Sequence, residues 1–148
     1  MGTILKKKQI SKILNIKGNL LMLDTTEIFL SKKKSISKKK INICDWFFKE
    51  HLIDNPLMPG ILITETMLQS SICILKKKFK LQNKQILIIK KNVSFLDKIN
   101  KENGILKTNT IIKKSKSKYF QSESTSFFKS KKIAHGKFMF IKYENKKI

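Results

Sequence analysis

The sequence predicts an α+β fold in which an antiparallel sheet wraps around one long central helix. The stretch from Pro59 to about Lys77 is apolar on nearly every side, which is typical of a helix buried in the middle of a domain. Several other segments are rich in Ile, Phe, Thr or Tyr and are separated by turn residues, which is typical of strands that could cover such a helix. The chain has 148 residues, of which 41% are hydrophobic. This is enough for a core without disulfides, so we expect residues 1–148 to form one domain.

The elements that precede the long helix are short. Residues 9–16 place apolar side chains at helical spacing, so we expect an amphipathic helix that ends before Gly18. Residues 20–30 form an apolar run with β-branched members, which indicates a strand. The lysine-rich segment SKKKSISKKK, residues 31–40, indicates a solvated turn, and a second short strand should end near Cys44. Together these segments predict a hairpin.

The long helix follows an aromatic cluster and a rigid turn. Trp46, Phe47 and Phe48 are too large and apolar to remain in water, so we expect them to anchor the next segment on the core. The segment LIDNPLMPG contains two prolines and a glycine, which excludes regular structure. Pro59 suits the first residue of the helix, where its missing N–H costs nothing. Four further strands are predicted, at residues 85–89, 105–112, 119–128 and 133–143.

The formal net charge of +23 would by itself suggest a nucleic-acid or membrane partner. However, every basic residue is lysine, and residue types with A/T-rich codons predominate, so drift in base composition explains the charge more simply. Arginine, the usual reader of guanine and phosphate, is absent. We therefore expect no nucleic-acid role. An acidic protein partner remains compatible with the basic surface.

No segment of the sequence has the pattern of a signal peptide or a membrane span. The amino-terminal residues lack an uninterrupted apolar region, and the longest apolar stretch is broken by Glu65 and Gln69. Cys44 and Cys73 lie far apart and build neither a CxxC metal site nor a disulfide framework. We expect a soluble cytoplasmic protein whose two thiols are reduced and lie in apolar surroundings.

Glu65 is the unexpected residue of the long helix. It lies about a turn and a half beyond Pro59, where an ionised carboxylate without partners would cost several kcal/mol if fully buried. Burial would raise the pKa of this carboxyl and make it a proton donor near neutral pH. The alternative is that Glu65 lies on a solvated flank of the helix.

His51 and Gly60 add two further chemical groups to the same short block. The His51 imidazole could act as a general base, although a histidine that is merely hydrogen-bonded in the turn is the alternative. The free amide of Gly60, at the start of the helix, could hold a developing oxyanion. A base, an acid and an oxyanion donor are the parts needed to remove a proton beside a carbonyl and expel a hydroxyl.

The segment from Phe47 to Gln69, FFKEHLIDNPLMPGILITETMLQ, resembles the active-site segment of the β-hydroxyacyl-(acyl carrier protein) dehydratases, which have the hotdog fold. In that family an aromatic pair leads to a Gly-His-Phe turn, then to Pro-x-Met-Pro-Gly and a helix that carries the acid. Weaker similarity covers residues 13–24 and 131–141. The positions that match without a gap are Phe47, Phe48, His51, Pro56, Met58, Pro59, Gly60, Leu62, Glu65, Met67 and Gln69.

The resemblance implies a hotdog dimer, or a trimer of dimers, with the active site at the dimer interface. His51 of one subunit would remove the C2 proton of a 3-hydroxyacyl thioester, and Glu65 of the partner subunit would protonate the departing hydroxyl. The Gly60 amide would hold the thioester carbonyl. The remaining substrate-binding positions would be Phe48, Met58, Pro59 and Gln69. No metal or organic cofactor is implied, and the acyl group would arrive on an acidic carrier protein, which would suit a lysine-rich rim.

The turn around His51 departs from the family pattern. Glu50 replaces the glycine before the histidine, and residues 52–54, Leu-Ile-Asp, replace Phe-Pro-Gly. A carboxylate beside His51 would tend to raise the pKa of the imidazole and weaken it as a base. Two alternatives to a dehydratase therefore stay open: a hotdog thioesterase in which Glu65 activates water, and a non-catalytic module that binds acylated carrier protein.

Overall fold

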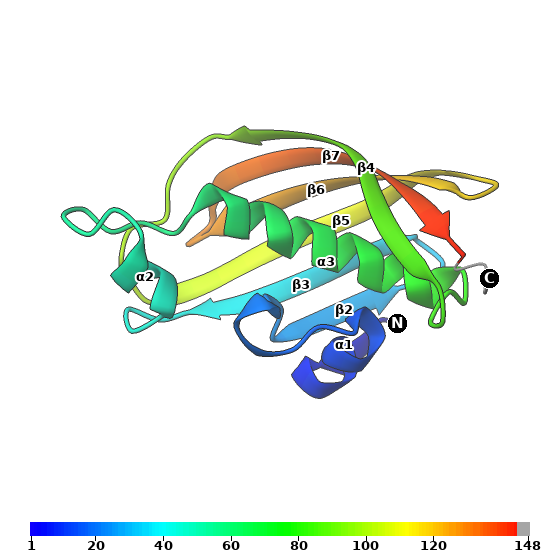
Figure 1. Cartoon of the computed structure of the whole chain (residues 1–148), viewed down its shortest axis with the longest axis horizontal. Coiled ribbons are helices and arrows are strands. Elements are labelled where there is room, and N and C mark those ends of the chain that lie inside the picture. The colour runs from blue at the N-terminus through cyan, green and yellow to red at the C-terminus, as the bar shows by residue number, and fades with distance from the viewer. Residues whose placement is uncertain (145–148) are drawn as a thin grey trace.

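A computed structural model describes residues 1–144, and in this part of the chain a single antiparallel sheet curls around one long helix (Figure 1). The helices are α1 (Lys7–Leu14), the 3-10 turn η1 (Gly18–Leu20), α2 (Trp46–Glu50) and α3 (Gly60–Lys78). The strands are β1 (Thr3–Lys6), β2 (Thr25–Phe29), β3 (Lys34–Ile41), β4 (Gln85–Phe95), β5 (Gly104–Lys116), β6 (Tyr119–Phe128) and β7 (Lys131–Tyr143). Their order across the sheet is β1-β2-β3-β5-β6-β7-β4.

The predicted central helix is confirmed as α3, although its start differs by one residue. Pro59 is the N-cap and not the first helical residue, because its ψ of 133° is extended while its φ of −59° would suit a helix. Met67 and Ile74 are completely buried against the sheet. Ile61, in contrast, is 72% exposed in the first turn. The helix is therefore buried along most of its length and open at its amino-terminal end.

A layer of hydroxyl groups lies between α3 and the sheet. The Ser70 hydroxyl of the helix shares hydrogen bonds with Ser37 at 2.7 Å, Ser35 at 3.1 Å and Thr110 at 3.1 Å. The Ser71 hydroxyl shares a hydrogen bond of 2.8 Å with the Ser122 hydroxyl of β6. Because each buried hydroxyl has a partner, these small polar residues can replace apolar ones in the core.

The expected lysine-rich turn at residues 31–40 is wrong, because most of that segment is strand β3. Only the first residues form the turn, where Lys33 has a φ of 51°. The residue types along the strand explain the error: Ser35 and Ser37 face inward to Ser70, and Lys34, Ile36, Lys38 and Lys40 alternate with them on the outer face. Polar residues on both faces gave the strand no apolar signature. Strand β1, which pairs with β2, was also not predicted.

The strand expected at residues 20–30 is confirmed only in part, because β2 covers Thr25–Phe29 and Leu20 belongs to η1. The remaining predicted elements are confirmed, and β4, β5 and β7 are longer than expected. α1 covers most of residues 9–16, and β4 to β7 occupy the four predicted positions. Phe47 and Phe48 are buried as expected, whereas Trp46 is 37% exposed. Cys73 is buried, but Cys44 is exposed, so the expectation that both thiols lie in apolar surroundings is wrong for Cys44.

This arrangement, a long helix enclosed by a curled antiparallel sheet, is the hotdog fold that the resemblance implies. The sheet's two edges are β1 and β4. Among residues 1–144, no helix combines the length and the apolar character that crossing a membrane requires.

Candidate active site

The turn after α2 fixes the orientation of the His51 ring. His51 follows the last residue of α2 with extended backbone, and its Nδ1 lies 3.0 Å from the Leu57 carbonyl oxygen. A carbonyl oxygen only accepts, so in this hydrogen bond Nδ1 carries the proton. The neutral ring then has its lone pair on Nε2. His51 is therefore held as the tautomer in which the outer nitrogen can take a proton.

The turn is itself fastened to the loop between β4 and β5. Leu57 pairs with Asn100 in an isolated antiparallel bridge, and the Met58 amide donates to the Ile99 carbonyl at 2.8 Å. Met58 is 1% exposed. Leu52, directly after His51, has a φ of 51°, which is costly for a leucine. The conformation around His51 is thus imposed by its supports and not by local preference.

Two aromatic residues of α2 lie in the core shortly before this turn. Phe47 and Phe48 are buried, and their ring centroids lie 4.7 Å apart. Phe48, which the resemblance places among the substrate-binding positions, is only 2% exposed in the single chain. Glu50 is exposed, and among the described residues no ion pair links it to His51.

Glu65 lies in α3 and is half-buried. Its Oε1 accepts a hydrogen bond from Gln69 Nε2, one turn further along the helix, at 2.9 Å. The carboxylate is thus neither sealed in the core nor free on a solvated flank, as the two expectations from sequence had it. A half-exposed, hydrogen-bonded carboxyl group can still exchange a proton with a bound molecule.

Gly60 begins α3 beside a hollow. Within residues 1–144 its amide has no backbone acceptor, as expected for the first turn of a helix. Its Cα lies against the Phe95 ring, since a methyl group added there would be 3.0 Å from Phe95 Cζ. The adjoining hollow has a volume of about 500 Å³ and is lined by Ile61, Thr64, Lys91, Asn92, Val93 and Phe95. This space lies next to Gly60, whose amide the sequence predicts as the oxyanion donor.

The structure brings the expected site residues to the amino-terminal part of α3 and the turn before it. Pro59 and Gly60 form the helix start, and Glu65 follows on the helix. Among the described residues, no hydrogen bond or ion pair joins His51 to Glu65. Sequence reasoning missed the Leu57 carbonyl and the backbone partners of Gln69, because no residue type marks a backbone group. Within the described chain, no cluster of three or more His, Cys, Asp and Glu side chains could hold a metal ion.

Residues 15–137 match the FabA-like domain family over most of the chain. The chain belongs to the FabA-like domain family. Among the similar proteins, this FabA-like domain is 32% identical over 85 residues to the 3-hydroxyacyl-(acyl-carrier-protein) dehydratase FabZ of Koribacter versatilis, covering 57% of this chain and 54% of that enzyme. It is 24% identical over 139 residues to FabZ of Pediococcus pentosaceus, covering 94% of this chain and 93% of that enzyme. The chain therefore spans about half the length of the first relatives it matches, and nearly all of the Pediococcus pentosaceus protein.

Solved structures show the same fold at low sequence identity. This FabA-like domain superposes with a TM-score of 0.61 on a hypothetical thioesterase with coenzyme A from Streptococcus pneumoniae, at 8% identity over 76% of this chain and 80% of that chain. A phenylacetic acid degradation-related protein of Ralstonia eutropha gives a TM-score of 0.63 at 11% identity, over 77% and 80% of the two chains. At these identities the likeness concerns the fold alone.

Proposed function

We propose that this FabA-like domain dehydrates 3-hydroxyacyl thioesters carried on acyl carrier protein to trans-2-enoyl thioesters, in fatty-acid or related acyl biosynthesis. The observation that carries the proposal is the hydrogen bond from His51 Nδ1 to the Leu57 carbonyl, which leaves Nε2 free to act as a base. The relatives named as 3-hydroxyacyl-(acyl-carrier-protein) dehydratases support the same reaction. His51 makes this hydrogen bond although Glu50 and residues 52–54 depart from the family pattern.

In the proposed reaction, His51 Nε2 takes the proton from C2 of the substrate. The negative charge that develops on the thioester carbonyl is held by the Gly60 amide and by the dipole of α3. The electron pair of the broken C2–H bond forms the double bond between C2 and C3 as the C3–O bond breaks. Glu65 gives its proton to the leaving hydroxyl, so that water departs. The reaction transfers no electrons to an outside acceptor, and the proposal includes no metal or organic cofactor.

The proposal places the site between two copies of the chain, as a homodimer or a trimer of dimers. Support comes from strand β4, an edge of the sheet that carries exposed apolar side chains at Leu87, Ile88 and Ile89. An exposed apolar edge strand is a natural surface for pairing with a second strand. Pairing there would bring the second chain next to the hollow beside Gly60, because Lys91, Asn92, Val93 and Phe95 of β4 line that hollow. His51 would then face Glu65 of the partner subunit.

Acyl carrier protein is the proposed partner. The net charge of +23 would attract an acidic protein even if the lysine excess arose from drift in base composition. Phe48, Met58 and Pro59 are proposed to shape the substrate-binding side of the turn. A cytoplasmic location remains a prediction.

The test compares the purified chain with two variants and two matched controls, using a 3-hydroxyacyl thioester as substrate. His51→Ala and Glu65→Gln should each lower kcat by roughly two orders of magnitude or more, because each removes a proton-transfer group. His135→Ala and Glu123→Gln alter the second histidine and another half-buried glutamate, both on outward-facing positions of β7 and β6, and should retain the activity.

Three other outcomes would contradict the proposed function. Full activity in both His51→Ala and Glu65→Gln would show that neither residue has the catalytic role assigned to it. Release of free thiol without enoyl product would favour the thioesterase. Binding of acylated carrier protein without turnover at any chain length would indicate a non-catalytic module.

A further inference from the structure

Gln69 has no free hydrogen-bonding group in this structure. Its side chain is completely buried, and its Oε1 accepts the Met22 amide at 2.8 Å. Its Nε2 donates to the Leu20 carbonyl at 2.7 Å and to Glu65 Oε1 at 2.9 Å. The orientation of the amide is fixed, because Met22 N–H requires an acceptor and the Leu20 carbonyl requires a donor. The remaining amide proton therefore points to Glu65.

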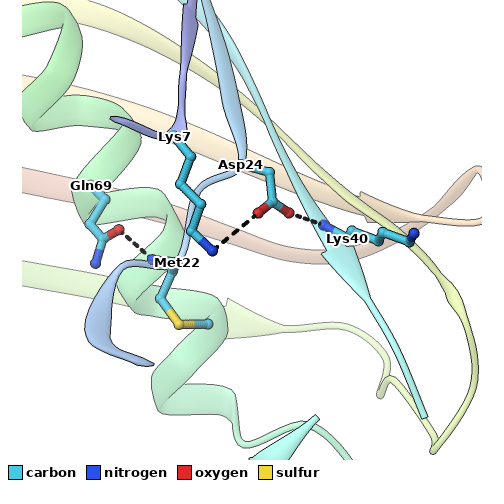
Figure 2. A network of polar contacts seen from close by, with 5 residues as sticks. All are labelled: Lys7, Met22, Asp24, Lys40 and Gln69. Atoms are coloured by element: carbon cyan, nitrogen blue, oxygen red, sulfur yellow. Dashed lines mark hydrogen bonds and ion pairs between the residues drawn. The ribbon is translucent and has the colours of Figure 1, made fainter. Parts of the chain in front are cut away.

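Leu20 and Met22 belong to residues 15–24, which we call the strap. The strap connects α1 to β2 and contacts α3 at Gln69. The strap is fastened at its far end independently of Gln69. There, Asp24 accepts the Lys40 amide of β3 at 2.6 Å, and the Asp24 amide donates to the Lys38 carbonyl at 2.9 Å. Figure 2 shows Gln69 on α3 and Asp24 beside β3, with Met22 between them.

The near end of the strap is also fixed. α1 ends at Leu14, and Lys76 Nζ of α3 donates to the Ile13 carbonyl in that last turn at 3.0 Å. Asn15 then turns the chain with a φ of 56°. A cation at the carboxyl end of a helix is favourable, and Lys76 is only 7% exposed. The strap is thus a pre-formed backbone support onto which Gln69 fits.

The geometry points to a positioning role for the strap: we propose that its backbone, through Gln69, holds the Glu65 carboxylate in place for proton transfer. Among residues 1–144, Gln69 is the hydrogen-bond partner of the Glu65 side chain. Without it, a half-exposed glutamate could move through several rotamers. The inference deepens the proposed function and rests on it. It assigns Gln69 and the strap to support of the acid and not to contact with the substrate.

The test is a double-mutant cycle between Gln69 and Glu65 with the dehydration assay. Gln69→Met keeps the length of the side chain but neither fixes Met22 nor donates to Glu65. We expect kcat to fall roughly tenfold to a hundredfold with KM changed less than about threefold, since misplacing a reacting group by an ångström has effects of this size. Ser71→Ala is the matched control, because it also removes buried hydrogen bonds from α3 but does not touch Glu65, and it should retain kcat.

The cycle separates positioning from a general structural role. If Gln69 acts through Glu65, adding Gln69→Met to Glu65→Gln should lower the rate less than about threefold further, because interacting residues are not additive. An equal loss in both backgrounds, or a Gln69→Met enzyme as fast as wild type, would overturn the inference. Asp24→Ala removes the side-chain bond to the Lys40 amide and the ion pair with Lys7, but it keeps the backbone bond to Lys38. It therefore loosens the far end of the strap and should lower kcat by roughly threefold to tenfold.

A readout without activity distinguishes failure of this inference from failure of the proposed function. Amide hydrogen exchange at Met22 should become faster in Gln69→Met and stay slow in Ser71→Ala. Unchanged exchange at Met22 in Gln69→Met would overturn the contact between strap and Gln69 whatever the activity. A wild-type chain without dehydratase activity would instead contradict the proposed function, and the exchange result would still decide whether the strap depends on Gln69.

Discussion

At the scale of single residues, the candidate site depends on backbone groups as much as on side chains. The Leu57 carbonyl sets the tautomer of His51, and the backbone of the strap orients Gln69. His51, Glu65 and Gly60 could be selected from the sequence because an imidazole, an acid and a glycine at a helix start are recognisable chemical types. Their supports could not, since any residue can supply a carbonyl or an amide.

The two cysteines offer a residue-scale prediction. Burial raises the pKa of the Cys73 thiol to about 12, although Lys76 and Lys77 partly oppose the shift, whereas Cys44 is exposed. The thiolate is the reactive form, so at pH 8 a thiol reagent should modify Cys44 rapidly and Cys73 only after unfolding. Equal rates for both thiols in the native protein would contradict the buried position of Cys73. A Cys44→Ser variant should show no rapid reaction.

The same shift has a defined sign for stability. Because the pKa of Cys73 is higher in the folded chain than its ordinary value of 9.0, the folded state binds more protons between pH 9 and pH 12. The contribution of this thiol to the free energy of unfolding is therefore constant below pH 9 and declines as the pH rises through that range.

At the scale of elements, the hydroxyl layer joins α3 to three strands. Ser70 contacts Ser35 and Ser37 on β3 and Thr110 on β5, and Thr110 also shares a hydrogen bond of 2.7 Å with Ser124 on β6. A serine at this position allows the helix to lie close to the sheet while every hydroxyl keeps a partner.

Replacing Ser70 tests the contribution of this layer. Ser70→Ala should lower the free energy of unfolding by about 1–3 kcal/mol, because Ser35 loses its hydrogen-bond partner in the core and two other hydroxyls lose one bond each. Urea denaturation measures the change. Ser31→Ala, at an exposed turn position, is the control and should leave the midpoint unchanged. Equal midpoints for the two variants would show that the layer adds little.

The elements also show where prediction from the sequence succeeds. The apolar helix and the four later strands carry strong patterns, and all five were predicted. The sequence predicts a turn where β3 lies, because the inward residues in the first half of the strand are Ser35 and Ser37 and most of its outward residues are lysines. The hydrophobic alternation on which strand prediction rests is absent when a core face is built from hydroxyls. What marks β3 as a core strand is the hydrogen bond from its serines to Ser70 of α3, and Ser70 is distant in the sequence.

At the scale of the whole molecule, His51 and Glu65, the proposed base and acid, share no hydrogen bond or ion pair within the described single chain. The chain also presents a sheet edge, β4, with exposed apolar side chains beside the hollow at Gly60. A two-fold pairing across this edge would bury those side chains and give each assembly two equivalent sites. We therefore predict that neither subunit is active alone and that each site takes His51 from one subunit and Glu65 from its partner.

Subunit complementation tests this claim most directly. His51→Ala and Glu65→Gln chains, each nearly inactive with a 3-hydroxyacyl thioester, are mixed under conditions that allow subunits to exchange. Random pairing gives half heterodimers, each with one intact site of two, so activity should recover to roughly a quarter of the wild-type rate. A mixture no more active than its two components, although exchange is shown to have occurred, would contradict a dehydratase site shared between subunits.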